Sequence, residues 1–310
     1  MRSTTDVLRR GFDSTLANWP LIAIRIAESV LLVLLFIASI FAAIVPVGIA
    51  ASFSNFRNLD EPAQAIAAFA IEHWTLIAYL FVVALVVVII LVAIHSFVEA
   101  GSARVFVDAE RNATGAAPKR EAFRTFNMDR WVQGGRAYWW TVFWIYNIVW
   151  GIGGLIILIP LILTLAAMFL VTEPGGRIAI ACGGLFLTFA VVIPVSIVMA
   201  LVSEKAIAIA VGRGANARDA VNTGWAEIKR DFGRHFAVAF IVFAIALGGA
   251  MAISSVMAPI SFIRDVSHAP LTSIAFAPAQ IVSSFAQSVF SAAVGLWFLA
   301  AYVGLTEEKE

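Results

Sequence analysis

The sequence predicts an all-α fold, a polytopic membrane helix bundle with six transmembrane helices. Hydrophobic residues make up 61% of the 310 residues, and charged residues make up only 13%, about half their share in a soluble domain. Six apolar segments each reach the roughly 20 residues that a helix needs to cross a bilayer. An open strand in lipid would leave backbone groups unpaired, so we expect helices. The composition excludes a soluble enzyme, a disordered chain and a disulfide scaffold, the last because Cys182 is the one cysteine.

The predicted spans are residues 21–50, 74–98, 137–171, 178–202, 236–260 and 276–305. The third is long and is interrupted by Gly151, Gly153, Gly154 and Pro160, so two short spans are the alternative to one. For six spans, 17 of the 21 Lys and Arg residues fall on one side of the membrane, including those of both termini. Splitting the third span would spoil this bias. The positive-inside rule therefore predicts six spans with both termini in the cytoplasm.

Three segments that precede the odd-numbered spans resemble one another, at residues 5–12, 120–126 and 218–225. Each has an acidic residue in its opening turn, followed by apolar residues and an aromatic residue. An acidic side chain suits a helix N-terminus, and an aromatic side chain suits the headgroup level. We therefore expect three interfacial amphipathic helices, each leading into a two-span hairpin. The single membrane domain, residues 1–310, would then contain three repeat units, 1–118, 119–217 and 218–310.

The first of these helices is expected within residues 1–20, ahead of the first span. One broad apolar face would lie in the membrane interface. That face comprises Val7, Leu8, Phe12, Leu16 and Trp19.

The segment 222–232, Asn-Thr-Gly-Trp-Ala-Glu-Ile-Lys-Arg-Asp-Phe, runs directly into an apolar span, and residues 11–19 are similar to it. This pattern resembles bacterial six-span membrane proteins related to the membrane domain of glycerophosphoryl diester phosphodiesterases. The resemblance implies a multi-pass protein of the bacterial cytoplasmic membrane. It implies no phosphodiesterase activity, because the two large loops are too short for that catalytic domain.

Charged residues gather near the cytoplasmic ends of the first, second and fourth spans. Arg25 and Glu28 are three residues apart, and His95 and Glu99 are four apart, so each pair can share a helix face. Glu204 and Lys205 occupy the matching end of the fourth span. These six residues could form one polar cluster, since charges inside a membrane segment are often functional. The alternative is that they meet headgroups and water at the helix ends.

The sixth span carries a polar stripe at helical spacing. A polar face avoids lipid, so we expect it, and Gln287 in particular, to face other helices or a water-filled space. The stripe comprises Gln280, Ser284, Gln287, Ser288 and Ser291.

The motifs favour a protein that is not an enzyme. No metal-ligand spacing, phosphate-binding loop or catalytic Ser/His/Asp set is recognisable, so we expect no cofactor and no metal. A net charge of +1 gives no field to attract nucleic acid. The leading hypothesis is a structural or accessory component that interacts with membrane lipids and with other membrane proteins. The alternative is a transporter or permease-like protein with a polar path along the sixth span.

The predicted topology is testable with reporter fusions. Because the positive-inside rule orients the spans, fusions after Glu110 and after Asp219 should report the cytoplasm, and a fusion after Glu61 should report the outside. Paired alkaline phosphatase and fluorescent-protein fusions measure this. An external signal after Asp219 would instead support two short spans in place of the third, which makes seven spans in all.

Overall fold

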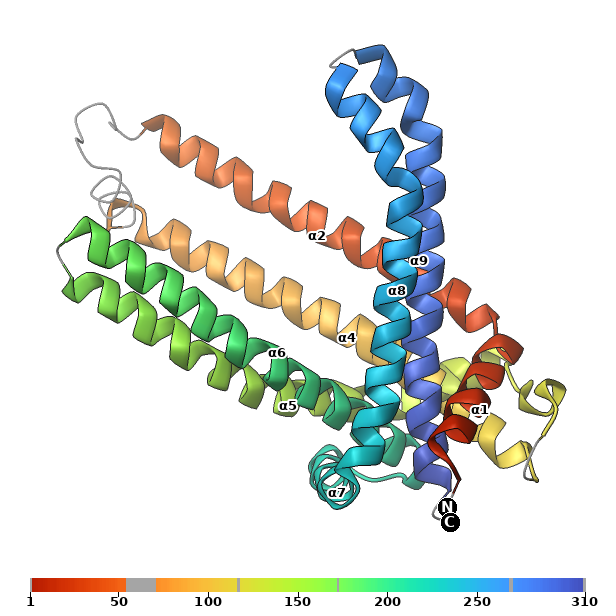
Figure 1. Ribbon diagram of the computed structural model, residues 1–310. Coiled ribbons are helices and arrows are strands. Elements are labelled where there is room, and N and C mark those ends of the chain that lie inside the picture. Colours follow the sequence, from red (N-terminus) through yellow and green to blue (C-terminus); the bar gives the residue numbers. More distant parts are fainter. Residues whose placement is uncertain (1, 54–70, 116–117, 172, 268–269, 309–310) are drawn as a thin grey trace. The chain divides into compact units, whose positions relative to one another are not determined.

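The computed structural model describes residues 2–53, 71–115, 118–171, 173–267 and 270–308 and contains no strand among them (Figure 1). All its long elements are helices, and six of these are long and apolar enough to cross a membrane. The predicted all-α fold with six spans is therefore confirmed. The α-helices are α1 Thr4–Ala17, α2 Pro20–Phe53, α4 Trp74–Asn112, α5 Met128–Leu170, α6 Pro174–Arg213, α7 Ala217–Arg230, α8 Phe232–Ser267 and α9 Pro270–Glu307.

The ambiguous third segment is one helix. α5 runs without a break from Met128 to Leu170 and includes Pro160, a residue type that transmembrane helices tolerate. The alternative of two short spans is therefore wrong.

The chain divides into two compact units. One unit comprises residues 26–95, which contain most of α2 and the first part of α4. The most apolar stretch of each of these helices has no buried residue, as is expected of helices whose surroundings are lipid. The other unit comprises residues 1–25 and 96–310 and contains the remaining helices.

The second unit has its buried core where the predicted spans end. We call residues 96–112 of α4, 199–213 of α6 and 292–307 of α9 the three-helix core. α4 and α6 continue past their predicted spans here, whereas the α9 segment is the last part of the sixth predicted span. Small side chains such as Ala103, Ala206 and Ala301 are completely buried there. A Cβ on Gly304 of α9 would lie only 3.3 Å from Glu110 Oε1 of α4. Small residues let the helices approach this closely.

α1 begins at a capped N-terminus and packs on α9. The Asp6 backbone N–H donates to Ser3 Oγ at 3.1 Å, and Ser3 Oγ donates to Asp6 Oδ2 at 2.6 Å. The second bond lowers the pKa of Asp6 and keeps its charge at the positive end of the helix. A Cβ on Gly11 would lie 2.9 Å from the backbone N of Ala301, so only glycine permits this approach.

The buried face of α1 differs from the predicted one. Val7 and Leu8 are buried, but Phe12 and Trp19 are exposed, and the remaining buried positions are polar or glycine. Trp297 Nε1 of α9 donates to Leu8 O at 2.8 Å. The helix therefore turns Val7 and Leu8 toward its own chain, because α9 offers a surface that fits Gly11.

α7 repeats the features of α1. Asn216 Oδ1 accepts a bond of 3.0 Å from the Asp219 N–H, as Ser3 does from Asp6. A Cβ on Gly224 would lie 3.3 Å from the backbone N of Ala206 in α6, as Gly11 lies against α9. α1 and α7 both have 14 residues and both lead directly into a span.

The middle of the three predicted interfacial helices is absent from the described structure. Residues 120–123 form only a single 3₁₀ turn, η2 (Arg120–Phe123), and the chain is then extended up to the α5 cap. The buried Asn18 side chain explains this: its Oδ1 accepts from the N–H groups of Thr125 and Phe126, and its Nδ2 donates to Phe123 O. Bonds from Asn18 replace the intrahelical bonds that a helix there would need.

A substitution at Gly11 tests the packing of α1 on α9. We expect Gly11→Ala to lower the thermal stability of the protein in detergent, because overpacking costs about 1–3 kcal/mol. Gly248→Ala is the matched control, since a Cβ on Gly248 meets nothing within 4 Å. Alanine there should be neutral or favourable by up to about 1 kcal/mol. Equal unfolding temperatures for the two variants would contradict the close packing of Gly11 on α9.

Candidate functional site

Arg10 of α1 is a buried charged side chain with several hydrogen-bond partners. Its side chain is 2% exposed and binds the Glu110 carboxylate in a two-pronged ion pair, with Nη2–Oε2 at 2.7 Å and Nε–Oε1 at 2.9 Å. It also donates to Ala113 O and Gly115 O, and its guanidinium lies 5.1 Å from the Phe123 ring centroid. Paired geometry and added hydrogen bonds are what a buried charge requires. Arg10 therefore fastens α1 to the end of α4.

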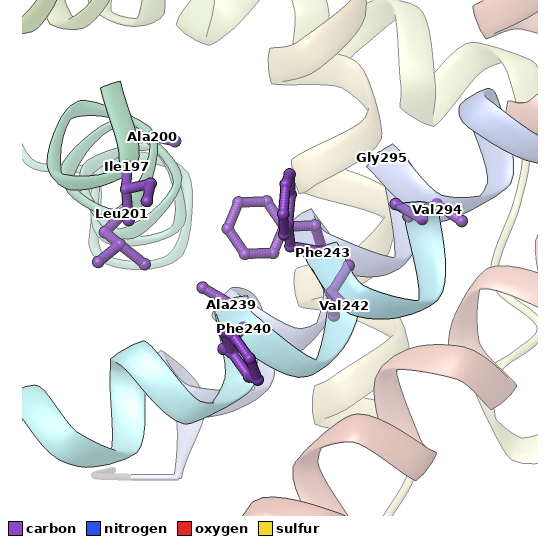
Figure 2. Close-up of a pocket in the computed structure, with 11 residues that line it drawn as sticks. Ile197, Ala200, Leu201, Ala239, Phe240, Val242, Phe243, Val294 and Gly295 are labelled. Atoms are coloured by element: carbon purple, nitrogen blue, oxygen red, sulfur yellow. The ribbon is translucent and has the colours of Figure 1, made fainter. Parts of the chain in front are cut away.

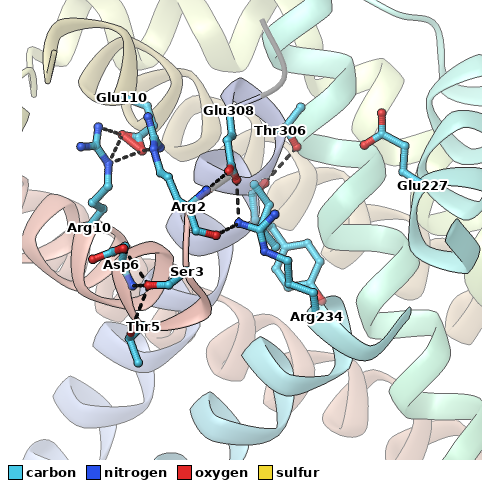
Figure 3. A network of polar contacts seen from close by, with 12 residues as sticks. Arg2, Ser3, Thr5, Asp6, Arg10, Glu110, Glu227, Arg234, Thr306 and Glu308 are labelled. Carbon is cyan, nitrogen blue, oxygen red and sulfur yellow. Dashed lines mark hydrogen bonds and ion pairs between the residues drawn. The ribbon is translucent and has the colours of Figure 1, made fainter. Parts of the chain in front are cut away.

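The two ends of the described chain join at the same place (Figure 3). Arg2 Nη1 donates to Glu110 Oε1 at 2.8 Å, and the Arg2 backbone N–H donates to Glu308. Arg234 of α8 bridges them, with Nη2 2.6 Å from Arg2 O and 2.7 Å from Glu308 Oε2. These bonds connect α4, α8 and the C-terminal end of α9.

Arg111 links the three helices of the core. Its Nε donates to Glu307 Oε2 of α9 at 2.7 Å, and its Nη2 donates to Gly212 O of α6 at 2.8 Å. The last carbonyl groups of a helix have no intrahelical partner, and acidic residues there face the negative end of the dipole. Arg111 satisfies both needs at once.

Lys205 of α6 has its side chain completely buried and holds α7 and α9. Its ammonium group pairs with Glu227 Oε2 of α7 at 3.0 Å and donates to Thr306 Oγ1 at 2.9 Å and to Leu305 O at 3.3 Å. An ammonium group has three donors, and each has an acceptor here. We call the bonds made by Arg2, Arg10, Arg111, Lys205 and Arg234 the ion-pair network.

A second polar site lies among α2, α4 and α6. Arg25 forms an ion pair with Glu99, whose side chain is 1% exposed. Glu204 is near enough to interact electrostatically with both, and no hydrogen-bond donor among the described residues reaches its buried Oε2. One guanidinium therefore faces two carboxylates.

Of the six residues predicted to form one polar cluster, Arg25, Glu99 and Glu204 lie close together. Glu28 and His95 form a pair within residues 26–95, with Nδ1–Oε1 at 2.7 Å. Lys205 binds Glu227, Thr306 and Leu305 in the ion-pair network. Glu204 and Lys205 are consecutive residues, so their side chains point about 100° apart around the helix and contact different neighbours.

The polar stripe of α9 lies mostly on the surface. Ser284, Gln287, Ser288 and Ser291 are exposed, and Gln280 is partly buried. Ser288 Oγ donates to Ser284 O at 2.8 Å, one turn back in the same helix. Gln287 is exposed in this chain, so the expectation that it faces other helices or a water-filled space stays a prediction. α8 packs on a different face of α9, where Gly249 meets Phe290.

Two apolar cavities lie beside the core. The first, which we call the α8 cavity, holds about 250 Å³ and has only apolar lining residues, among them Ala200, Phe240 and Gly295 (Figure 2). The second, which we call the α7 groove, holds about 500 Å³ between α5, α6 and α7. Asn222 and Trp225 of α7 line it in addition to apolar residues of the two spans.

The described residues bring no group of three His, Cys, Asp or Glu side chains together in a way that could hold a metal ion. The ion-pair network was not predicted from the sequence, since its arginines were interpreted only as topology signals. A signal was present: runs of small residues, such as Ala100-Gly101-Ser102-Ala103, continue past the apolar spans and precede Glu110 and Arg111. Small residues beyond a span indicate helix packing there.

The chain was compared with protein-family models, with curated proteins and with solved structures, and none of them matches it. The structure is therefore interpreted from its own residues.

Removing Glu110 tests the ion-pair network. We expect Glu110→Ala to destabilise the protein by about 3–5 kcal/mol, because it leaves the buried Arg10 charge without its carboxylate. Arg120→Ala is the control: it breaks a pair with Asp13 whose arginine side chain is 52% exposed, and should cost at most about 1 kcal/mol. Denaturant unfolding in mixed micelles measures both. Similar losses for the two variants would show that Arg10 and Glu110 are not held in a buried pair.

Proposed function

We propose that this integral membrane protein is a non-enzymatic structural or accessory component of the bacterial cytoplasmic membrane, which contacts lipids and partner membrane proteins. The observation that carries the proposal is the ion-pair network, in which buried charges bind other helices of the same chain. Arg10 and Lys205 each use several donors on carboxylates or backbone carbonyls of neighbouring helices. Charges used in this way hold a rigid core together.

The exposed spans support the same proposal. The most apolar stretches of α5, α6 and α8 are only 17% buried within the chain, so most of their surface is free for lipid or for helices of other proteins. Apolar area of this kind is suited to a membrane environment. We further propose that both termini lie in the cytoplasm, since most lysines and arginines are on that side.

A transport function is the second candidate, and the buried site of Arg25, Glu99 and Glu204 favours it. Ionisable side chains buried among the helices of a membrane protein often mark proton and ion pathways. Transport also requires a continuous polar path, for which the stripe on α9 is the candidate.

Cysteine labelling of α9 separates the two functions. Single cysteines at Ser284, Gln287, Ser288 and Ser291 are introduced after Cys182→Ser, because Cys182 is exposed. If the protein is a structural component, the introduced cysteines should react with a lipid-soluble maleimide or be protected by a partner. A charged maleimide should not label them. Labelling of all four positions by the charged reagent from both sides of the membrane would refute the structural proposal and establish a water-filled path.

A further inference from the structure

We propose that the α7 groove binds one acyl chain of an anionic phospholipid and that Lys229 binds its headgroup phosphate. This inference rests on the proposed function, since it requires that α5 and α6 lie in the membrane. It goes further by assigning a site and a lipid class.

The walls of the groove have the chemistry of a hydrocarbon site. They are formed by residues of the two spans, among them Ile152, Gly153, Val195 and Val198. Gly153 adds no side chain to its wall. Ile152 is 59% exposed, so its side chain lies at the outer surface of the spans, where lipid tails are present. A volume of about 500 Å³ is within the range of pockets that hold small molecules.

The side of the groove formed by α7 is different, because polar and aromatic groups line it beside the aliphatic Val221. Asn222 and Trp225 line this side. Tryptophan is enriched at headgroup depth, where its ring meets the acyl chains and its edge meets water. α7 is fixed in this position, because Lys205 pairs with Glu227 and Gly224 approaches the backbone of Ala206.

Lys229 supplies the charge complementarity. Its Nζ lies 5.4 Å from the centroid of the Trp225 ring, so the ammonium group stands at the polar side of the groove. No carboxylate among the described residues forms an ion pair with it, whereas Lys205, Arg213 and Arg234 each have one. A phosphate headgroup whose acyl chain entered the groove would meet this ammonium group. A zwitterionic lipid carries a cationic group as well and is attracted less.

The α8 cavity provides an internal comparison. It too is apolar, but each of its lining residues is aliphatic, aromatic or glycine, with no polar side chain at its edge. We expect it to accept lipid tails without preference for a headgroup.

The experiment titrates the purified full-length protein, in a detergent that preserves its fold, with phosphatidylglycerol or phosphatidylcholine. Native mass spectrometry counts the bound lipids. We expect one phosphatidylglycerol to bind more tightly than phosphatidylcholine. Lys229→Gln should weaken that binding by roughly five-fold, the effect of one basic residue near an anionic lipid. Val195→Trp, which fills the groove, should abolish it.

Two matched controls accompany these variants. Lys119→Gln removes an exposed lysine elsewhere, and Gly295→Leu adds bulk to the α8 cavity, where a Cβ meets nothing within 4 Å. Both should keep the one phosphatidylglycerol molecule that binds more tightly than phosphatidylcholine, although Gly295→Leu is expected to lose lipid tails bound without preference in the α8 cavity. Equal losses for Lys229→Gln and Lys119→Gln would overturn the inference in favour of general surface charge. Equal binding of the two lipids, or unchanged binding in Val195→Trp, would also overturn it. Each failure leaves the structural role standing, because the labelling of α9 tests that role separately.

Discussion

Apolar helices in a bilayer gain little from contact with one another, since lipid tails are as apolar as their side chains. This constraint explains where the protein packs. The most apolar stretches of α2 and α4 contain no buried residue, whereas most residues are buried in the later parts of α4, α6 and α9, and in α9 this buried part lies within the predicted sixth span. There, small side chains permit close approach, and buried ion pairs fix which helices pair and in which register. The spans are therefore held together mainly near one end.

The spans themselves could be predicted, because length and hydropathy are local properties. So could the starts of α1 and α7, where a capping side chain precedes an acidic residue by three positions. The middle unit could not, because its conformation depends on Asn18, more than a hundred residues away in the chain. The partners of Lys205 were equally hidden, since Glu227 and Thr306 are brought to it only by packing. Hydropathy predicts where a helix crosses a membrane, but it does not predict which helices pack against one another.

The segments that begin the three predicted repeat units are all held by the same kind of contact, in which a glycine of one helix packs closely against another helix. Gly11 of α1 lies against Ala301 of α9, and Gly224 of α7 lies against Ala206 of α6. At the start of α5 the glycine belongs to the earlier hairpin instead: a Cβ on Gly101 of α4 would lie 2.6 Å from Nε1 of Trp131 in α5. In each case the second helix of one predicted two-span hairpin contacts the segment that begins another predicted hairpin. These contacts are similar at the starts of the three predicted repeat units, although the middle segment forms only a 3₁₀ turn and no separate helix. The threefold repeat stays a prediction.

The docking of α1 on α9 has a consequence for the order of events during synthesis. The bond from Trp297 to Leu8 joins residues 289 positions apart, so α1 cannot dock on α9 until the ribosome has synthesised the residues between them. Before that point Arg10 can already pair with Glu110, but the α9 surface that contacts Gly11 has not been made. α1 is therefore synthesised long before it reaches its final position. Final assembly must follow insertion of the spans, and a quality-control protease would find α1 accessible throughout that interval.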